Sequence, residues 1–315
     1  MVDIVQHRGE DFDITSLATL TRSVYMSEGR GDYTLEQIER YLINMNERFP
    51  LEVTFLAFKE NTIVGWIGVE RKSESVGELG RWYPFVSDIP DRDEIAELLI
   101  SEVMKYAIEN GMTRLEISFE ISDENVDAYN DRCSWFGSLD WGLVEDTYYM
   151  NMDVSEKIPE ASIPEGFHLH PLLEIDDDTL YKCHYATFTN SEAREFYDLT
   201  EDEKRQKFDK LYDRTQPINS KASVVLKHGD EIASLLLVVS RDDEEYFSIV
   251  AVHPNYRGQG LAKAVLTIGI QEVREQGTNN ISIGVDTVNK PAVQLYKKYG
   301  FKVVSRLSFH SWKAT

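Results

Sequence analysis

The chain has 315 residues, with 33 lysines and arginines against 55 aspartates and glutamates, and so a net charge of −22 at neutral pH. This excess of negative charge argues against nucleic acid or an anionic membrane surface as a partner. Its simplest consequence is solubility, although such a field also attracts cationic substrates such as amines. The length is about twice that of a typical domain and predicts two medium domains.

The two cysteines, Cys133 and Cys183, lie far apart and show no CxxC or zinc-ligand spacing. We therefore expect free thiols in a reducing compartment and no metal site. The first residues include acidic side chains and lack the apolar core of a signal peptide. No apolar run approaches the ~18 residues of a membrane span. Together these features predict a cytoplasmic protein that does not enter a membrane.

The first half of the chain predicts alternating helices and strands. A capping box, in which Thr34 and Gln37 satisfy each other's backbone N–H groups, marks the start of one helix. Apolar periodicity predicts helices over residues 14–26, 35–48 and 94–109, and strands over residues 53–58, 63–70, 79–86 and 115–119.

Residues 152–167 are polar, contain two prolines and a glycine, and lack periodicity, which is typical of a linker. We therefore predict a first domain over residues 1–152, a linker over residues 153–166 and a second domain over residues 167–315. In the second domain, Thr200 and Glu203 form another capping box, which opens a helix running to about Tyr212. Periodicity there also predicts a helix over residues 176–188 and strands over residues 167–172, 222–226, 232–240 and 246–252, with a closing antiparallel pair over residues 302–305 and 307–313.

The segment Val250–Ala262 (VAVHPNYRGQGLA) combines a strand, a glycine-containing turn and the start of a helix. This order directs several backbone N–H groups at the helix N-terminus, where the helix dipole adds partial positive charge. Glycines let an anion approach the backbone closely. The segment therefore predicts a site for a diphosphate, but it has the spacing of neither a Walker loop nor a dinucleotide fingerprint.

Arg257, Gly260 and Ala262 resemble the pyrophosphate loop of the GNAT acetyltransferases, whose pattern is Gln/Arg-x-x-Gly-x-Gly/Ala. A strand over residues 281–285, then Asn289 and a short helix with Tyr296, resembles the family's second signature. The resemblance implies an α/β fold with two tandem GNAT domains, each a central, mostly antiparallel mixed sheet flanked by helices. It also implies acetyl-CoA as co-substrate.

The resemblance further implies which residues hold acetyl-CoA. The strand backbone would pair with the pantetheine arm, and the loop would hold the diphosphate. Asn289 would hydrogen-bond the pantetheine, although an asparagine before a helix is also an ordinary N-cap. The expected cofactor residues are Val250, Ala251, Val252, Arg257, Gly258, Gln259, Gly260, Leu261, Ala262, Asn289 and Tyr296.

Tyr296 stands seven residues after Asn289, the spacing of the family's thiolate-protonating tyrosine, but it could also be a core aromatic residue. The sequence does not identify the general base, because Tyr246 and Gly284 occupy the two positions where relatives carry a glutamate. Candidates are Tyr246 through a water, Glu245 if a bulge turns it inward, His310, a carboxylate of the first domain, or solvent. Catalysis is thus assigned to Tyr296, with Tyr246 and Glu245 as further candidates.

The first half repeats the order of elements in weaker form, which suggests duplication. In place of the phosphate loop it has residues 87–93 (SDIPDRD), with no glycine and three carboxylates, so we expect a degenerate domain that holds no CoA. In layout the chain is similar to mycothiol synthase and other two-domain GNAT enzymes. Tyr246, however, stands where mycothiol synthase is expected to have a carboxylate on its catalytic strand.

The resemblance implies an N-acetyltransferase that acts on the primary amine of a small molecule, by direct transfer in a ternary complex. The acetyl oxygen would rest on a main-chain N–H near Val252. Two alternatives remain open: a non-catalytic acyl-CoA-binding regulator and a protein-modifying acetyltransferase. A monomer and a homodimer are equally compatible with the sequence.

Overall fold

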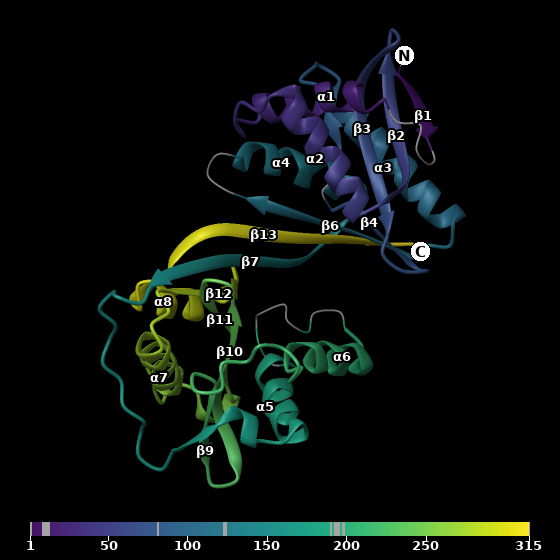
Figure 1. Ribbon diagram of the computed structural model, residues 1–315. Coiled ribbons are helices and arrows are strands. Elements are labelled where there is room, and N and C mark those ends of the chain that lie inside the picture. The colour runs from purple at the N-terminus through teal and green to yellow at the C-terminus, as the bar shows by residue number, and fades with distance from the viewer. Residues whose placement is uncertain are drawn as a thin grey trace. The chain divides into compact units, whose positions relative to one another are not determined.

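The computed structural model describes residues 2–7, 13–80, 82–121, 125–189, 191, 196 and 199–314. The chain forms two compact units (Figure 1). The first unit comprises Met1–Val144 and Leu307–Thr315, and the second comprises Glu145–Arg306.

The first unit is a mixed sheet with helices against it. Its strands lie in the order β1-β2-β3-β4-β6-β13, and β5 pairs with β3. Neighbours are antiparallel in β1–β2–β3–β4, whereas β4 and β6 are parallel. Its elements are β1 (Asp3–His7), α1 (Ile14–Ser27), α2 (Leu35–Arg48), β2 (Leu51–Lys59), β3 (Thr62–Arg71), β4 (Val76–Glu78), β5 (Phe85–Val86), α3 (Arg92–Glu109), β6 (Arg114–Ile121), α4 (Val126–Gly137) and part of β13 (Lys302–Lys313).

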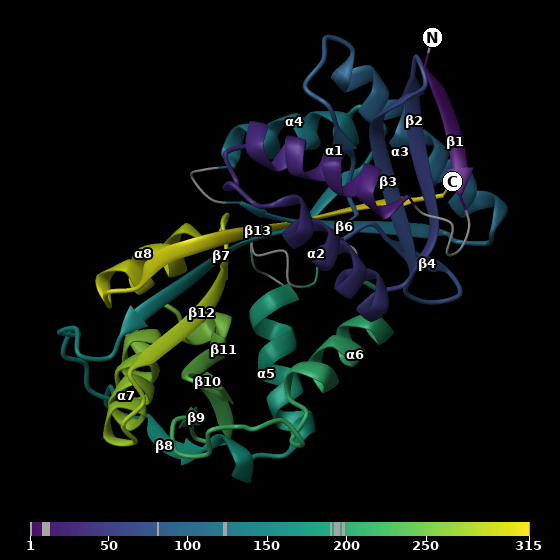
Figure 2. The same ribbon diagram turned by 45° about the horizontal axis from the view of Figure 1, so that its top comes forward.

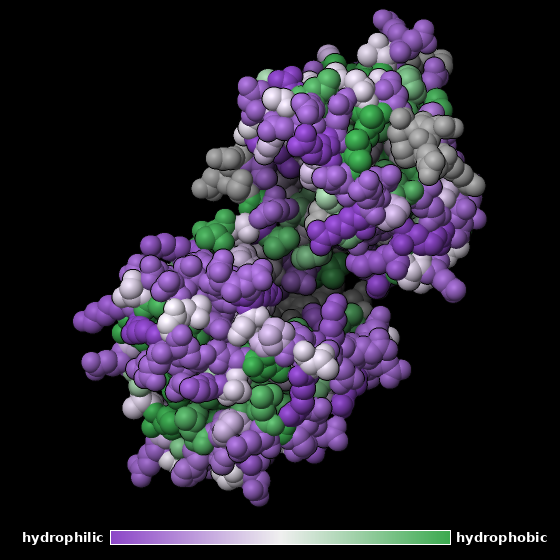
Figure 3. All heavy atoms as spheres, viewed as in Figure 1, coloured by the Kyte–Doolittle hydropathy of each residue, from purple (hydrophilic) through white to green (hydrophobic). Residues whose placement is uncertain are grey.

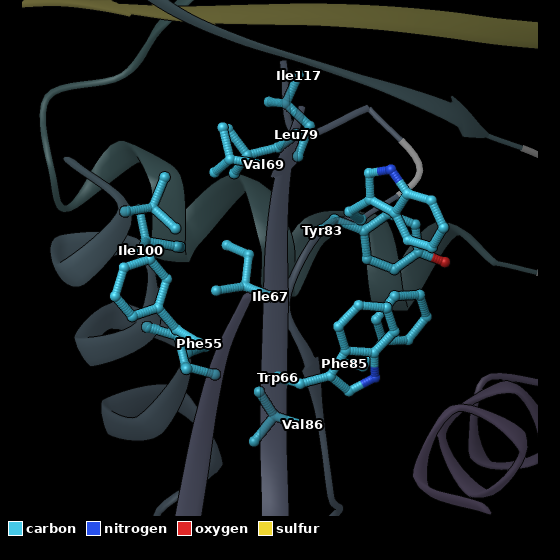
Figure 4. Packing of buried hydrophobic residues seen from close by; sticks show 14 of the residues in the cluster. Phe55, Trp66, Ile67, Val69, Leu79, Tyr83, Phe85, Val86, Ile100 and Ile117 are labelled. Atoms are coloured by element: carbon cyan, nitrogen blue, oxygen red, sulfur yellow. The ribbon is translucent and has the colours of Figure 1, made fainter. Parts of the chain in front are cut away.

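The strand β3 has buried side chains on both of its faces, because successive residues point to opposite sides of a sheet. Figure 4 shows Ile67 on the side of Phe55 and Ile100, and Trp66 on the other side. Trp66 stacks on Phe85 with ring centroids 4.8 Å apart. Contacts of β3 with both α1 and α3 explain why the strand is apolar throughout its middle.

The predicted helices of the first unit are confirmed, but one predicted strand is wrong. The capping box of Thr34 and Gln37 opens α2. Residues 79–86 were expected to form one strand, yet among the residues of that range that the structure describes only Phe85–Val86 form a strand. Gly80 has a positive φ of 42°, and Pro84 lacks an N–H for the ladder, so the backbone cannot remain extended. The short strands β1 and β4 were not predicted.

The second unit is a mixed sheet in the order β7-β12-β11-β10-β9-β8. Here β11 and β12 are parallel, and the other neighbouring pairs in this order are antiparallel. Its elements are β7 (Gly142–Asp153), β8 (His168–Pro171), α5 (Asp177–Thr189), α6 (Glu201–Leu211), β9 (Val224–His228), β10 (Glu231–Arg241), β11 (Glu244–Val252), α7 (Leu261–Glu275), β12 (Asn280–Asp286), α8 (Lys290–Lys298) and part of β13 (Lys302–Lys313).

Helices cover both faces of this second sheet, with α7 on one side and α5 on the other (Figures 1 and 2). On the α7 side, Gly269 lets the helix approach β10 closely, since a Cβ there would lie 2.2 Å from a methyl group of Leu236. On the α5 side, Leu235 and Ile249 pack into a separate apolar cluster with Phe208. The predicted capping box of Thr200 and Glu203 opens α6.

Two strands differ from the sequence analysis. Thr147–Met152 of β7, assigned there to the first domain, pair with β12 in the second unit, and so does Asp153, the first residue of the expected linker. The expected closing pair of strands is instead the single strand β13 of 12 residues. No glycine, proline or asparagine interrupts Ser305–Leu307, so the chain has no local signal for a turn.

Hydrophilic side chains cover most of the visible surface of each unit (Figure 3). Residues 154–167, between β7 and β8, contain no helix or strand. Among the helices in the described part of the chain, none has the length and apolar character needed to cross a membrane.

Candidate functional site

The strands β11 and β12 separate halfway along their length. Their parallel pairing joins Glu244–Phe247 to Asn280–Ile283 and goes no further, although β11 continues to Val252. On its other edge β11 stays paired with β10, with a bulge between the Ile249 and Phe247 pairs. The main chain of Ser248–Val252 is therefore available on one side to an extended ligand, which needs only free main-chain groups.

The turn after β11 is shaped by glycines in a left-handed conformation. Gly258 has φ +79° and Gly260, the N-cap of α7, has φ +84°, a region that favours glycine. The first main-chain bond into the helix runs from Ala264 N–H to Gly260 O. The N–H groups before Ala264 have no carbonyl within the helix to bond, so the end of α7 is suited to an anion.

Arg257 is held by main-chain carbonyls. Its guanidinium donates to the carbonyl oxygen of Thr187 at 3.0 Å and to that of Val252 at 3.4 Å. The side chain thus ties the end of α5 to the loop and keeps its positive charge beside the helix N-terminus.

A cavity of about 770 Å³ lies where the split strand, the loop and α8 meet. It brings together most of the expected cofactor residues, including Val250, Val252, Asn289 and Tyr296. Ala251 and Gln259 do not line it, and the Ala251 side chain is buried on the α5 side. The sequence analysis missed several lining residues from the end of α5 and from the loop and α8: Thr187, Phe188, Ser191, Tyr256, Lys263, Pro291, Ala292 and Leu295.

Asn289 is the N-cap of α8, and Tyr296 lies near the C-terminal end of the same helix. Asn289 accepts a hydrogen bond from Ala292 N–H at 3.3 Å, so the ordinary capping role is present, and it also lines the cavity. Tyr296 is 5% exposed and lines the same cavity. Burial, and to a lesser extent the nearby Tyr246, raise the pKa of Tyr296 above its usual value, so its phenol keeps its proton at neutral pH.

The candidates for the general base lie in three different places. Tyr246 reaches toward β12, because a Cβ on Gly284 would lie 3.0 Å from its hydroxyl oxygen. Glu245 is buried, accepts hydrogen bonds from the Ser240 hydroxyl at 3.0 Å, and does not line the cavity. The bulge follows Glu245 in the chain, so it does not turn this side chain toward Tyr296. His310 lies in the first unit, beside Ser308.

The corresponding region of the first unit contains ion pairs in place of a glycine loop. Asp91 pairs with Lys59 at 2.7 Å, and Asp93 accepts a hydrogen bond from Trp135 at 2.7 Å. Arg132 stands seven residues after Asn125, as Tyr296 does after Asn289 in the second unit. Arg132 is 1% exposed and is ion-paired with the buried Glu28.

Residues 185–301 match the Acetyltransferase (GNAT) family, so the chain contains a GNAT acetyltransferase domain. The matched segment includes the split strand, the glycine turn, Asn289 and Tyr296. The resemblance to the GNAT acetyltransferases, inferred from two short motifs, is thereby confirmed.

Three relatives illustrate the similarity. The spore coat polysaccharide biosynthesis protein SpsD of Bacillus subtilis (strain 168) is 26% identical over 150 residues, 47% of this chain and 52% of that protein. The mycothiol acetyltransferase of Propionibacterium freudenreichii is 25% identical over 146 residues, 46% of each chain. The mycothiol acetyltransferase of Paenarthrobacter aurescens (strain TC1) is 26% identical over 188 residues, which are 57% of this chain and 55% of that protein. The chain thus spans about half the length of the relatives it matches.

A solved structure extends the likeness to the whole chain. The GCN5-related N-acetyltransferase from Sphaerobacter thermophilus aligns with a TM-score of 0.56 and 15% identity, covering 98% of this chain and 95% of that chain. At this identity the likeness concerns the fold, and it confirms the predicted α/β class with a large mixed sheet flanked by helices.

Proposed function

We propose that the second unit binds acetyl-CoA and transfers its acetyl group to the primary amine of a small molecule. The observation that carries this proposal is the cavity in which a split strand, a helix N-terminus and a buried tyrosine meet. The GNAT domain and the relatives named acetyltransferases support the reaction class.

The cavity offers a separate contact for each part of acetyl-CoA. The free N–H groups before Ala264 would bind the diphosphate, with the Arg257 charge beside them. The main chain of Ser248–Val252 would pair with the pantetheine arm, and Asn289, which also lines the cavity, would complete that contact. Acetyl-CoA itself supplies an activated acyl group as a thioester.

Transfer would occur directly between the two substrates in a ternary complex. The amine nitrogen forms a bond to the thioester carbon, the carbon–sulfur bond breaks, and the sulfur takes the proton of the Tyr296 phenol. The tyrosine then regains a proton from the amine through water, so the products are an amide and a thiol. A main-chain N–H of the free strand segment near Val252 would stabilise the oxyanion.

We also propose that the N-terminal domain, predicted over residues 1–152, is a degenerate copy that holds no CoA. The carboxylates at its counterpart of the loop, Asp91 and Asp93, would repel a diphosphate and are engaged with Lys59 and Trp135. Arg132 of α4, buried and ion-paired with Glu28, stands as far after Asn125 as Tyr296 stands after Asn289 in the second unit.

The test is amine-dependent release of CoA, followed with a thiol reagent over a panel of small primary amines. We expect release with at least one amine, together with mass-spectrometric detection of its acetamide. Binding of acetyl-CoA without release for any amine, peptides included, would instead indicate the non-catalytic regulator.

A further inference from the structure

A polar surface lies on the side of the second sheet where Tyr246 stands, and we call it the acceptor wall. It is formed by Tyr149, Asn151, Glu244, Tyr246 and Ser282, from the adjacent strands β7, β12 and β11. The Tyr149 hydroxyl donates to the Glu244 carboxylate at 3.0 Å, and its oxygen also lies 3.0 Å from the Ser282 hydroxyl oxygen. The Tyr149 ring stacks on that of Tyr246, with ring centroids 6.1 Å apart. These contacts fix the two tyrosines beside one carboxylate.

Glu244 is the charged member of this wall, and its hydrogen-bond partners among the described residues are neutral. Its carboxylate accepts from the Tyr149 hydroxyl and, at 3.5 Å, from the Asn151 amide. Within the described residues, no lysine, arginine or histidine lies within ion-pair distance of it. A half-buried carboxylate loses part of its hydration, and a cation brought to it would offset that cost.

Arg241 shows how the wall accommodates a cation. Its guanidinium carbon lies 3.6 Å from the centre of the Tyr246 ring, within cation–π range, and it donates to the Tyr149 hydroxyl at 3.0 Å. The residue is exposed and ends β10, opposite Glu244 in the hairpin register. A positively charged group on an exposed side chain therefore occupies the aromatic face next to the carboxylate.

The wall adjoins the reaction centre that the proposed function requires. Tyr246 lies near Tyr296. The Tyr246 hydroxyl also approaches Gly284 of β12, the strand that separates from β11 at the split. An acceptor molecule reaching the thioester from this side would place the rest of its body along Tyr246, Tyr149 and Glu244. Such an acceptor would meet a carboxylate and two aromatic rings.

We propose that the acceptor wall binds a second positive charge on the substrate, so that the acceptor class is an aliphatic diamine or polyamine. The second ammonium group takes the place of the Arg241 guanidinium against Tyr246 and forms an ion pair with Glu244. This inference rests on the proposed function and names its substrate class.

The test compares three probes of similar length: 1,4-diaminobutane, butylamine and 4-aminobutanoate. For the wild type we expect KM to be lowest for the diamine and highest for the amino acid. Glu244→Gln should raise KM for the diamine at least about tenfold, the loss expected for a charge-assisted contact, and leave KM for butylamine unchanged. Arg241→Gln should lower KM for the diamine, because the competing guanidinium is gone. Asp243→Asn removes a neighbouring exposed charge and serves as the control without effect.

Calorimetric titration of 1,4-diaminobutane into the wild type and Glu244→Gln decides the inference independently of turnover. Weaker binding in Glu244→Gln supports it even if no acetylation occurs, in which case the proposed function alone fails. Equal KM and equal affinity for the diamine in wild type, Glu244→Gln and Asp243→Asn would overturn it, as would equal losses for all three probes. Acetyl-CoA binding should be the same in all these variants.

Discussion

Tyr246 of β11 lies near Tyr296 of α8, at the split between β11 and β12. The proximity of Tyr246 adds to the effect of burial in raising the pKa of Tyr296. Gly284 makes this arrangement possible, since a Cβ there would come within 3.0 Å of the Tyr246 hydroxyl. In the proposed function the thioester would lie beside Tyr296, which lines the cavity, with Tyr246 on the side of the acceptor wall.

Replacing Tyr296 with phenylalanine removes the proposed proton donor while keeping the ring that packs in the core. We expect kcat to fall by about 10²- to 10⁴-fold, the usual contribution of a general acid. Affinity for acetyl-CoA, measured by calorimetry, should stay within a factor of about two because the cavity wall is preserved. A kcat equal to that of the wild type would exclude Tyr296 as the acid.

The raised pKa of Tyr296 also predicts the basic side of the pH–rate profile. A tyrosine of ordinary pKa ionises near pH 10, but Tyr296 should retain its proton beyond that pH. Loss of this donor should therefore not reduce kcat below about pH 10. A fall in kcat that begins near pH 8 and disappears in Tyr296→Phe would contradict this assignment.

His184 in α5 predicts how stability depends on pH. Burial is the main cause that lowers its pKa to about 3, and Lys207 contributes to the same direction. Below pH 6.5 the unfolded chain binds a proton that the folded chain does not, so the free energy of unfolding falls as the pH falls toward 3. The loss should approach about 1.4 kcal/mol per pH unit over the lower part of this window.

Denaturant unfolding of wild type and His184→Phe at pH 7 and pH 5 measures this loss. Between these values the wild type should lose about 2 kcal/mol more than the variant. Equal losses in the two proteins would show that His184 does not cause the dependence. The substituted ring keeps the aromatic contacts with Phe188 and Tyr212, so both proteins should fold at pH 7.

Gly269 tests the close approach of α7 to the sheet. Gly269→Ala introduces a Cβ that would meet Leu236 at 2.2 Å and Phe247 at 3.2 Å. We expect the free energy of unfolding to fall by about 1–3 kcal/mol from overpacking. Gly137→Ala, also in a helix but with no atom within 4 Å of the new Cβ, should be neutral or stabilising. Equal free energies of unfolding for the two variants would contradict the close packing of α7 against the sheet.

The sequence predicted those parts of the structure that depend on short-range pattern. Capping boxes at Thr34 and Thr200 mark the helix starts directly, because both partners lie within four residues. Asn289 and Tyr296 were paired as site residues from their resemblance to the second GNAT signature, and both line the cavity.

The remaining features depend on contacts between distant segments. Nothing in β7 indicates that Thr147–Asp153 should pair with β12 rather than with a strand of its own half. The contact of Arg257 with Thr187 joins residues seventy positions apart, so the contribution of α5 to the cavity had no local signal. The hydrogen bonds of Tyr149 to Glu244 are likewise visible only once three strands are assembled.

The most direct test of the account is calorimetric titration of acetyl-CoA into the wild type, Gly260→Glu and Gly229→Glu. Both glycines have positive φ and open space beside them, but only Gly260 lies at the cavity, so Gly229→Glu controls for backbone strain. We predict one site in the wild type and in Gly229→Glu, and none in Gly260→Glu, whose carboxylate would occupy the diphosphate position. Two sites in the wild type, or binding that survives in Gly260→Glu, would contradict the proposal that the loop of the second unit alone holds the cofactor.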